Sequence, residues 1–166
     1  MSWSQPNHNR IARNVIQQLT NQLENGTCEA FGSDQRVKVY VGGPYLYPDI
    51  SVACPKPEFE SIGGLLALVN PTLIVEVLSP TTARDDKRVK FTQFQTIPSF
   101  QEYLLIDSTA VNITHYKKQS DGTWLPNPIS DIETTLQLQS INCSLSLRAI
   151  YKKVDFSLST TPATNP

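Results

Sequence analysis

Apolar positions along the chain switch between a helical spacing and a strand spacing. In residues 9–23 the apolar side chains recur every three or four positions, which predicts an amphipathic helix that stops at Gly26. Residues 36–41 alternate polar and apolar, and a second strand pattern covers residues 47–54. Because glycine and proline lie between them, we expect these two segments to form a hairpin-like pair with a longer loop at its tip.

Two later segments are almost continuously apolar. Residues 72–78 and 102–107 are rich in aliphatic and β-branched side chains, which is typical of strands buried on both faces of a sheet. Between them, residues 79–82 can cap a helix that runs to about Gln95. The Pro- and Gly-rich stretch of residues 55–64 is expected to be a surface loop.

The C-terminal third alternates short apolar runs with polar ones. Further strands are predicted at residues 111–117, 123–125 and 134–138. Residues 148–154 predict a closing turn or short helix, and the Ser/Thr/Pro-rich residues 157–166 predict a disordered tail. The order of helix, strand pair, buried strand, helix and buried strand describes a mixed α/β fold around a central sheet, and we expect one domain over residues 1–156.

Composition and charge narrow the class of protein. The 166 residues are 39% hydrophobic and 17% charged, as in an ordinary globular domain. No apolar run approaches the roughly 20 residues of a membrane span, and the first ten residues have no apolar core of a secretory signal, so a cytoplasmic location is expected. The net charge of −1 gives no support to a broadly basic surface and does not exclude one, because a local patch can attract phosphate; residues 84–90 carry such a cluster of basic side chains.

The three cysteines are widely spaced and odd in number. They are Cys28, Cys54 and Cys143, none in a CxxC pair or close in sequence to a histidine. This pattern does not favour a zinc site, and we expect reduced, partly buried thiols.

Two carboxylates occupy unfavourable places for a charge. Glu76 interrupts the apolar run of residues 72–78, and Asp49 follows Pro48 at the start of an expected strand. A buried carboxylate needs a partner, a metal ion or a position at the solvent end of the sheet. Two carboxylates that converge from neighbouring strands form the oxygen site that Mg²⁺ prefers. Each residue also has a simpler interpretation: Asp49 as a turn residue, and Glu76 as half of a salt bridge.

A lysine on the following helix would complete this chemistry. It would orient an attacking water or stabilise the charge that develops on phosphorus during phosphodiester hydrolysis. Lys87 and Lys90 are the candidates, although a lysine on a charged helix is more often exposed to solvent.

Four stretches of the sequence together resemble the Uma2 family of bacterial restriction-endonuclease-like proteins. The stretches are Tyr47–Val52, Leu73–Thr82, Arg84–Phe91 and Ile97–Asp107. The resemblance runs from about His8 to Tyr151, and the Glu-Val-Leu-Ser-Pro motif with its downstream Asp-x-x-x-Lys is specific. It implies a restriction-endonuclease-like mixed sheet flanked by helices and membership of the PD-(D/E)xK nuclease superfamily. It further implies a Mg²⁺-dependent endonuclease (with Mn²⁺ able to substitute) that hydrolyses DNA phosphodiester bonds as a homodimer.

The resemblance also assigns roles to residues. Asp49 and Glu76 are implied to be catalytic metal ligands, with the Val77 main-chain carbonyl as a third ligand. The usual superfamily lysine would stand where this chain has Leu78, and the family is similar in moving that lysine to the next helix. Lys90 is the chosen catalytic lysine, because it shares a helix face with Phe94, and Lys87 is the alternative.

The family pattern leaves an alternative function open. Relatives tend to have a Tyr-Glu-Leu segment before the first helix whose acidic residue completes the site, and we expect this chain to lack it. A catalytically weak or inactive nuclease-fold protein that acts as a binding or interaction module is therefore the second hypothesis. His8 matches a position where relatives often have histidine but is expected at the surface, and Asp107 is expected to cap a strand end rather than bind metal.

Overall fold

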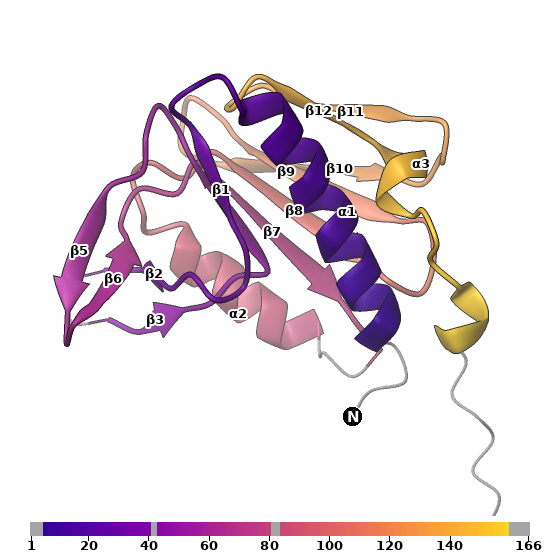
Figure 1. The fold of residues 1–166 in the computed structure, drawn as a ribbon, viewed down its shortest axis with the longest axis horizontal. Coiled ribbons are helices and arrows are strands. Elements are labelled where there is room, and N and C mark those ends of the chain that lie inside the picture. The colour runs from indigo at the N-terminus through magenta and orange to yellow at the C-terminus, as the bar shows by residue number, and fades with distance from the viewer. Residues whose placement is uncertain (1–4, 41–42, 81–83, 160–166) are drawn as a thin grey trace, which may run out of the picture.

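The centre of the molecule is a six-stranded mixed sheet with the strand order β1-β4-β7-β8-β9-β10 (Figure 1). The computed structural model describes residues 5–40, 43–80 and 84–159. The strands are β1 (Glu29–Phe31), β4 (Ile50–Ala53), β7 (Leu73–Leu78), β8 (Glu102–Asp107), β9 (Ile113–Lys118) and β10 (Trp124–Ile129). Strands β7 and β8 are parallel, and the other neighbours are antiparallel. The expected mixed α/β fold around a central sheet is confirmed.

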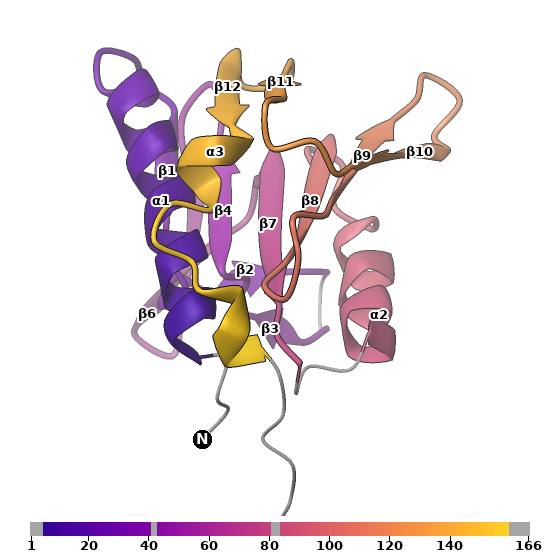
Figure 2. The same cartoon turned by 90° about the vertical axis from the view of Figure 1, so that its right-hand side faces the viewer.

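Helices cover both faces of this sheet. Helix α1 (Gln5–Leu23) and the short α3 (Leu147–Ile150) lie on one face, and α2 (Arg84–Phe94) lies on the other (Figure 2). The apolar stripe of α1 is fully buried at Ile11, Val15 and Leu19, as its spacing predicts. The helix begins four residues earlier than the predicted residue 9, so His8 lies within its first turns.

The unit β7-α2-β8 determines which side chains face which layer. Parallel strands need a crossover connection, and α2 supplies it. Alternate residues of β7 point to opposite faces: Val75 and Val77 join the core beneath α1, whereas Ile74 joins the core beneath α2. Glu76 therefore faces α2. Both buried strands and the helix between them are confirmed, while Thr81 and Thr82 of the expected cap lie outside the described residues.

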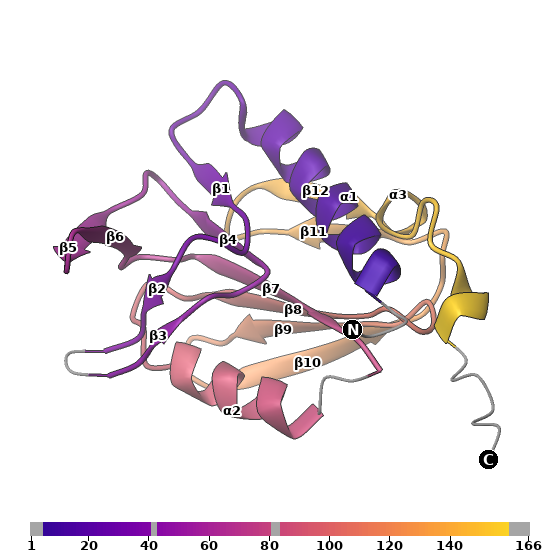
Figure 3. The ribbon, with the colours of Figure 1, turned by 60° about the horizontal axis from the view of Figure 1, so that its bottom comes forward.

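A smaller four-stranded sheet, of order β3-β2-β6-β5, corrects two predictions (Figure 3). Its strands are β2 (Val37–Lys38), β3 (Tyr45–Leu46), β5 (Phe59–Ile62) and β6 (Leu65–Leu68). The strand predicted at 47–54 is present as β4, but its predicted pairing with residues 36–41 is wrong, because β3 pairs with β2 here while β4 pairs in the central sheet. The predicted loop at 55–64 contains β5, whose hairpin turn uses Gly63 and Gly64 at φ 59° and 80°.

The C-terminal third adds a hairpin beside α1. It consists of β11 (Thr135–Leu138) and β12 (Cys143–Ser146), and the second strand was not predicted. Strand β10 extends through Pro126 and Pro128 beyond its predicted length, which an edge strand allows because its outer N–H groups need no partner. Residues 157–159, predicted as the start of a disordered tail, belong instead to the 3₁₀ helix η1 (Phe156–Ser159). Residues 160–166 of that tail lie outside the described residues.

The expectation that all three cysteines are reduced is wrong for two of them. Cys28 and Cys54 form a disulfide with a Cα–Cα distance of 4.5 Å, while Cys143 is a buried thiol. The physical reason is strand register: Glu29 pairs with Ala53 in the antiparallel β1–β4 pair, so the next residues outward, Cys28 and Cys54, stand opposite each other. Among the described residues, no helix is long and apolar enough to cross a membrane.

Candidate carboxylate site

Asp49 and Glu76 meet at the end of β7, where β4 begins. Asp49 stands one residue before β4, and its Oδ2 accepts a hydrogen bond of 2.7 Å from the Val77 N–H. An extended residue directs its N–H and C=O to the same side, so the Val77 carbonyl lies on the Asp49 side of β7. The neighbouring Leu78 carbonyl points the other way and accepts from Ser108 N–H. The structure thus brings together the three groups predicted as metal ligands.

The lysine that reaches these carboxylates is Lys87. Its Nζ lies 2.6 Å from Glu76 Oε2 and 4.0 Å from Asp49 Oδ2, and the residue is only 6% exposed. Lys90, chosen from the sequence, is half-buried and stands one turn nearer the C-terminus of α2. The geometry therefore favours the alternative, Lys87, as the lysine of the site. Helical spacing could not decide between them, because the start of α2 fixes which residue faces Glu76.

His8 is the site residue that sequence reasoning placed at the surface. Its Nε2 lies 3.2 Å from Asp49 Oδ1, and its side chain is 26% exposed. Since Val77 N–H holds the other oxygen, the Asp49 carboxylate is fixed from two sides. The sequence did offer one sign of a role for His8, its match to a histidine position in relatives. Its contact with Asp49 could not be predicted, because it depends on α1 starting at Gln5.

The surroundings push the pKa values of the two carboxyl groups apart. Burial raises the pKa of Glu76 to about 7, the Asp49 charge adds to the rise, and Lys87 opposes it. Burial also acts to raise the pKa of Asp49, but the hydrogen bond and charge of His8, with Val77 N–H and Lys87, outweigh it and lower the pKa. The same bond to Asp49 raises the pKa of His8. Divergent carboxyl groups of this kind can serve different roles in one site.

The groups present fit a small divalent cation. Glu76 is 1% exposed, and its Oε1 has no hydrogen-bond partner among the described residues. Within that same part of the chain, no three His, Cys, Asp or Glu side chains are arranged to hold a metal ion. A cation here would rest on two carboxylates and the Val77 carbonyl. That donor set suits Mg²⁺, which binds one or two carboxylates and keeps several waters.

Comparisons with known proteins identify the family and the fold. The model of the Uma2 family, described as "Putative restriction endonuclease", matches residues 1–149. The chain belongs to the Uma2 family. Its fold resembles that of a crystal structure described as "a putative nuclease belonging to DUF820" from Anabaena variabilis ATCC 29413. The TM-score is 0.69 at 19% identity, covering 93% of this chain and 82% of that one, which supports the fold alone.

Two proteins of Synechocystis sp. (strain ATCC 27184 / PCC 6803 / Kazusa) are similar to this Uma2 chain in sequence. One, sll1609, is 40% identical over 119 residues, which cover 72% of this chain and 67% of its own length. The other, slr1290, is 34% identical over 158 residues, which cover 94% of this chain and 80% of its own length.

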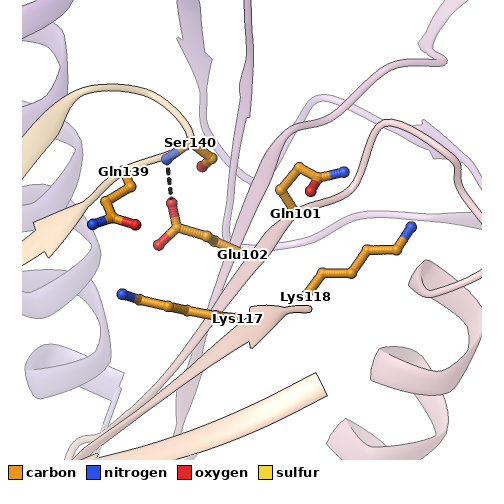
Figure 4. A pocket seen from close by; sticks show the side chains of 6 residues that line it. All are labelled: Gln101, Glu102, Lys117, Lys118, Gln139 and Ser140. Carbon is orange, nitrogen blue, oxygen red and sulfur yellow. Dashed lines mark hydrogen bonds between the residues drawn. The ribbon is translucent and has the colours of Figure 1, made fainter. Parts of the chain in front are cut away.

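This Uma2 protein has a second buried carboxylate, Glu102, at the first residue of β8. This end of β8 is the one away from Asp49 and Glu76. Glu102 is 3% exposed; one oxygen lies 2.5 Å from His115 Nε2, and the other accepts from Ser140 N–H at 2.7 Å. It borders an open cavity of about 300 Å³ in which Lys117 and Lys118 extend in different directions (Figure 4). Asp107, at the carboxyl end of β8, accepts from the N–H and hydroxyl of Thr109, as a strand-end cap does.

Proposed function

We propose that this Uma2 protein is a Mg²⁺-dependent endonuclease that hydrolyses DNA phosphodiester bonds, with Asp49, Glu76 and Lys87 as its catalytic groups. The observation that carries the proposal is the state of Glu76, a fully buried carboxylate with one oxygen on Lys87 and the other without a partner in the part of the chain that the structure describes. A structural ion pair would satisfy both oxygens. The family description as a restriction endonuclease supports the same reaction class.

In this proposal the carboxylates and the Val77 carbonyl hold the cation. When bound, Mg²⁺ supplies Lewis-acid stabilisation of phosphate oxygens and lowers the pKa of water. His8 and the Val77 N–H keep the Asp49 carboxylate in a fixed orientation, so it needs no reorganisation when substrate binds. Lys87 places its ammonium between the two carboxylates, where it can offset negative charge on the phosphorus centre.

The test combines metal binding with cleavage. Calorimetric titration with Mn²⁺ should show binding to the wild type and none to Glu76→Ala, and only the wild type should nick supercoiled plasmid. Glu133→Ala is the matched control, because it removes an exposed glutamate near Arg148, far along the chain from the site. Wild-type protein that binds neither Mg²⁺ nor Mn²⁺, with Glu76→Ala behaving identically, would refute the enzyme and favour a non-catalytic binding module.

A homodimer belongs to the same proposal and rests on the family resemblance. Sedimentation velocity over a range of protein concentrations checks it. A single species of 18.5 kDa at every concentration would contradict it.

A further inference from the structure

Two of the residues that α2 contacts each have a buried polar atom with no hydrogen-bond partner among the described residues. One is Glu76 Oε1, and the other is the phenol oxygen of Tyr103 in β8, a residue that is 1% exposed. Nearly all buried polar atoms in folded proteins are hydrogen-bonded, and leaving one unsatisfied costs on the order of 10-fold or more in the folding equilibrium. Two such atoms beneath one helix therefore call for a common explanation.

The sheet register places these two atoms near each other. Tyr103 is directly opposite Ile74 on the neighbouring strand, so Glu76, two residues further along β7, is its diagonal neighbour on the same face. Diagonal neighbours on two strands are roughly 7–8 Å apart, a gap that a tyrosine and a glutamate side chain can close.

The contacts of helix α2 agree with this placement. Phe91 stacks on the Tyr103 ring at 4.5 Å between centroids, and Lys87 contacts Glu76 at 2.6 Å. Lys87 and Phe91 are four residues apart, so they are separated by about one helical turn of roughly 5.4 Å. After burial, Glu76 is the strongest influence raising the pKa of the Tyr103 phenol, which agrees with this proximity.

The aromatic cluster around Tyr103 explains its ring but not its hydroxyl. Phe91, Phe100 and Tyr116 all contact the ring. A phenylalanine at this position would make the same ring contacts without burying an oxygen. The hydroxyl therefore needs a role beyond packing.

We propose that Tyr103 is a positioning residue of the carboxylate site, whose hydroxyl and Glu76 Oε1 bind one shared water molecule beneath α2. The proposal deepens the proposed function, because the water fixes the orientation in which Glu76 presents its carboxylate to a divalent cation. The phenol donates one hydrogen bond to the water, and the water donates one to Glu76 Oε1. Lys87 holds Oε2, so both oxygens of Glu76 are then engaged.

The first experiment uses metal-free protein and does not depend on nuclease activity. Tyr103→Phe, Glu76→Gln and the double variant are compared with wild type by thermal unfolding. A shared water makes the effects non-additive, so the change in Tm of the double variant should differ from the sum of the single changes by at least about 2 °C. Additive changes would overturn the proposal.

The second experiment measures Mn²⁺ affinity by calorimetry. Tyr103→Phe should weaken Mn²⁺ binding by about 10-fold, as removal of a group that orients a metal ligand does. The matched control is Tyr116→Phe, which removes a hydroxyl from the same aromatic cluster and should leave the affinity unchanged. A purely structural Tyr103 would give Tyr103→Phe wild-type affinity and a higher Tm.

The two experiments separate this proposal from the proposed function. If wild-type protein binds no Mn²⁺, the nuclease proposal fails, and the additivity of the metal-free variants still decides whether Tyr103 and Glu76 are linked. If Mn²⁺ binds and Tyr103→Phe binds it equally well, the nuclease proposal stands and the role of Tyr103 is refuted.

Discussion

Glu76 and Glu102 are both buried glutamates beside a basic side chain, yet their surroundings differ. Glu102 has both oxygens engaged, one by His115 and one by the Ser140 main chain. Glu76 has Lys87 on one oxygen, no protein partner on the other within the described residues, and a second carboxylate nearby. Burial tends to raise the pKa of both groups, but hydrogen bonds from His115 and Ser140 leave the pKa of Glu102 lowered, whereas that of Glu76 rises to about 7.

The difference supports the proposal that Glu76, rather than Glu102, belongs to a binding site. A buried charge whose oxygens are all held by protein groups stabilises one folded arrangement and has no exchangeable partner that a ligand could replace. A buried carboxylate with one oxygen not held by a protein group, and with a like charge beside it, becomes favourable when a cation arrives. On this argument we assign Glu102 a structural role and Glu76 a role in the proposed site.

Among the variants that test this comparison, Lys87→Met is expected to have the largest effect, a loss of cleavage activity. It removes the cation between Asp49 and Glu76 while keeping the apolar stem. Loss of a group that stabilises transition-state charge typically lowers kcat by about 100- to 1000-fold. Plasmid cleavage with Mn²⁺ measures the effect.

Lys90→Met is the matched control for this variant. It removes the same charge one helical turn away, and cleavage should change by less than about 5-fold because only long-range electrostatics are altered. If Lys90→Met abolished cleavage and Lys87→Met did not, the choice made from the sequence would be right and the geometric assignment wrong.

The sequence predicts the central layers because their patterns are unambiguous. The spacing of Ile11, Val15 and Leu19 fits a helix, and the short length and β-branched residues of the run 72–78 favour a strand over a buried helix. The small sheet was missed because β2 and β3 have two residues each, too few for a periodic signal. At residues 47–50 the chain passes from the small sheet, where β3 pairs, to the central sheet, where β4 pairs. This change depends on tertiary pairing, which no local sequence pattern contains.

The candidate site also contains residues that the local sequence reveals and residues that only the tertiary structure reveals. Asp49 and Glu76 could be found because a carboxylate within or beside an apolar strand is a local anomaly. The position of Lys87 and the contact between His8 and Asp49 depend on where α1 and α2 begin, and helix ends are poorly determined by sequence. The Cys28–Cys54 pair follows from the register of β1 on β4, which was not predicted because β1 was not.

Glu102→Ala should destabilise the fold, because Glu102 is the structural one of the two buried glutamates. It leaves His115 and the Ser140 N–H buried without their partner, and removal of one member of a buried pair lowers the free energy of unfolding by about 3 kcal/mol. Urea denaturation measures the change. Mn²⁺ affinity should stay at the wild-type value; a large loss of affinity with unchanged stability would reverse the roles assigned to Glu102 and Glu76.

Glu76→Gln should have a smaller effect of opposite sign. The amide keeps an oxygen for Lys87 but removes a buried negative charge beside Asp49. In metal-free protein near neutral pH the free energy of unfolding should therefore rise by about 1 kcal/mol. Urea denaturation in EDTA checks this, and Glu102→Gln is the control that should be destabilised. A destabilised Glu76→Gln would mean that Glu76 is a satisfied structural group like Glu102.

The smallest expected effect is the acid dependence of Glu102. Its folded-state pKa lies below the ordinary value of 4.5, because the bonds from His115 and Ser140 outweigh burial. A group with a depressed pKa contributes stability above its unfolded-state pKa, and this contribution is lost as pH falls through the folded-state pKa. The Tm difference between wild type and Glu102→Gln should thus be constant well above the ordinary pKa of 4.5 and shrink as the pH falls below it. A difference that stays constant throughout would mean that protonation of Glu102 does not weaken the fold, and its hydrogen bonds would then not favour the ionised form.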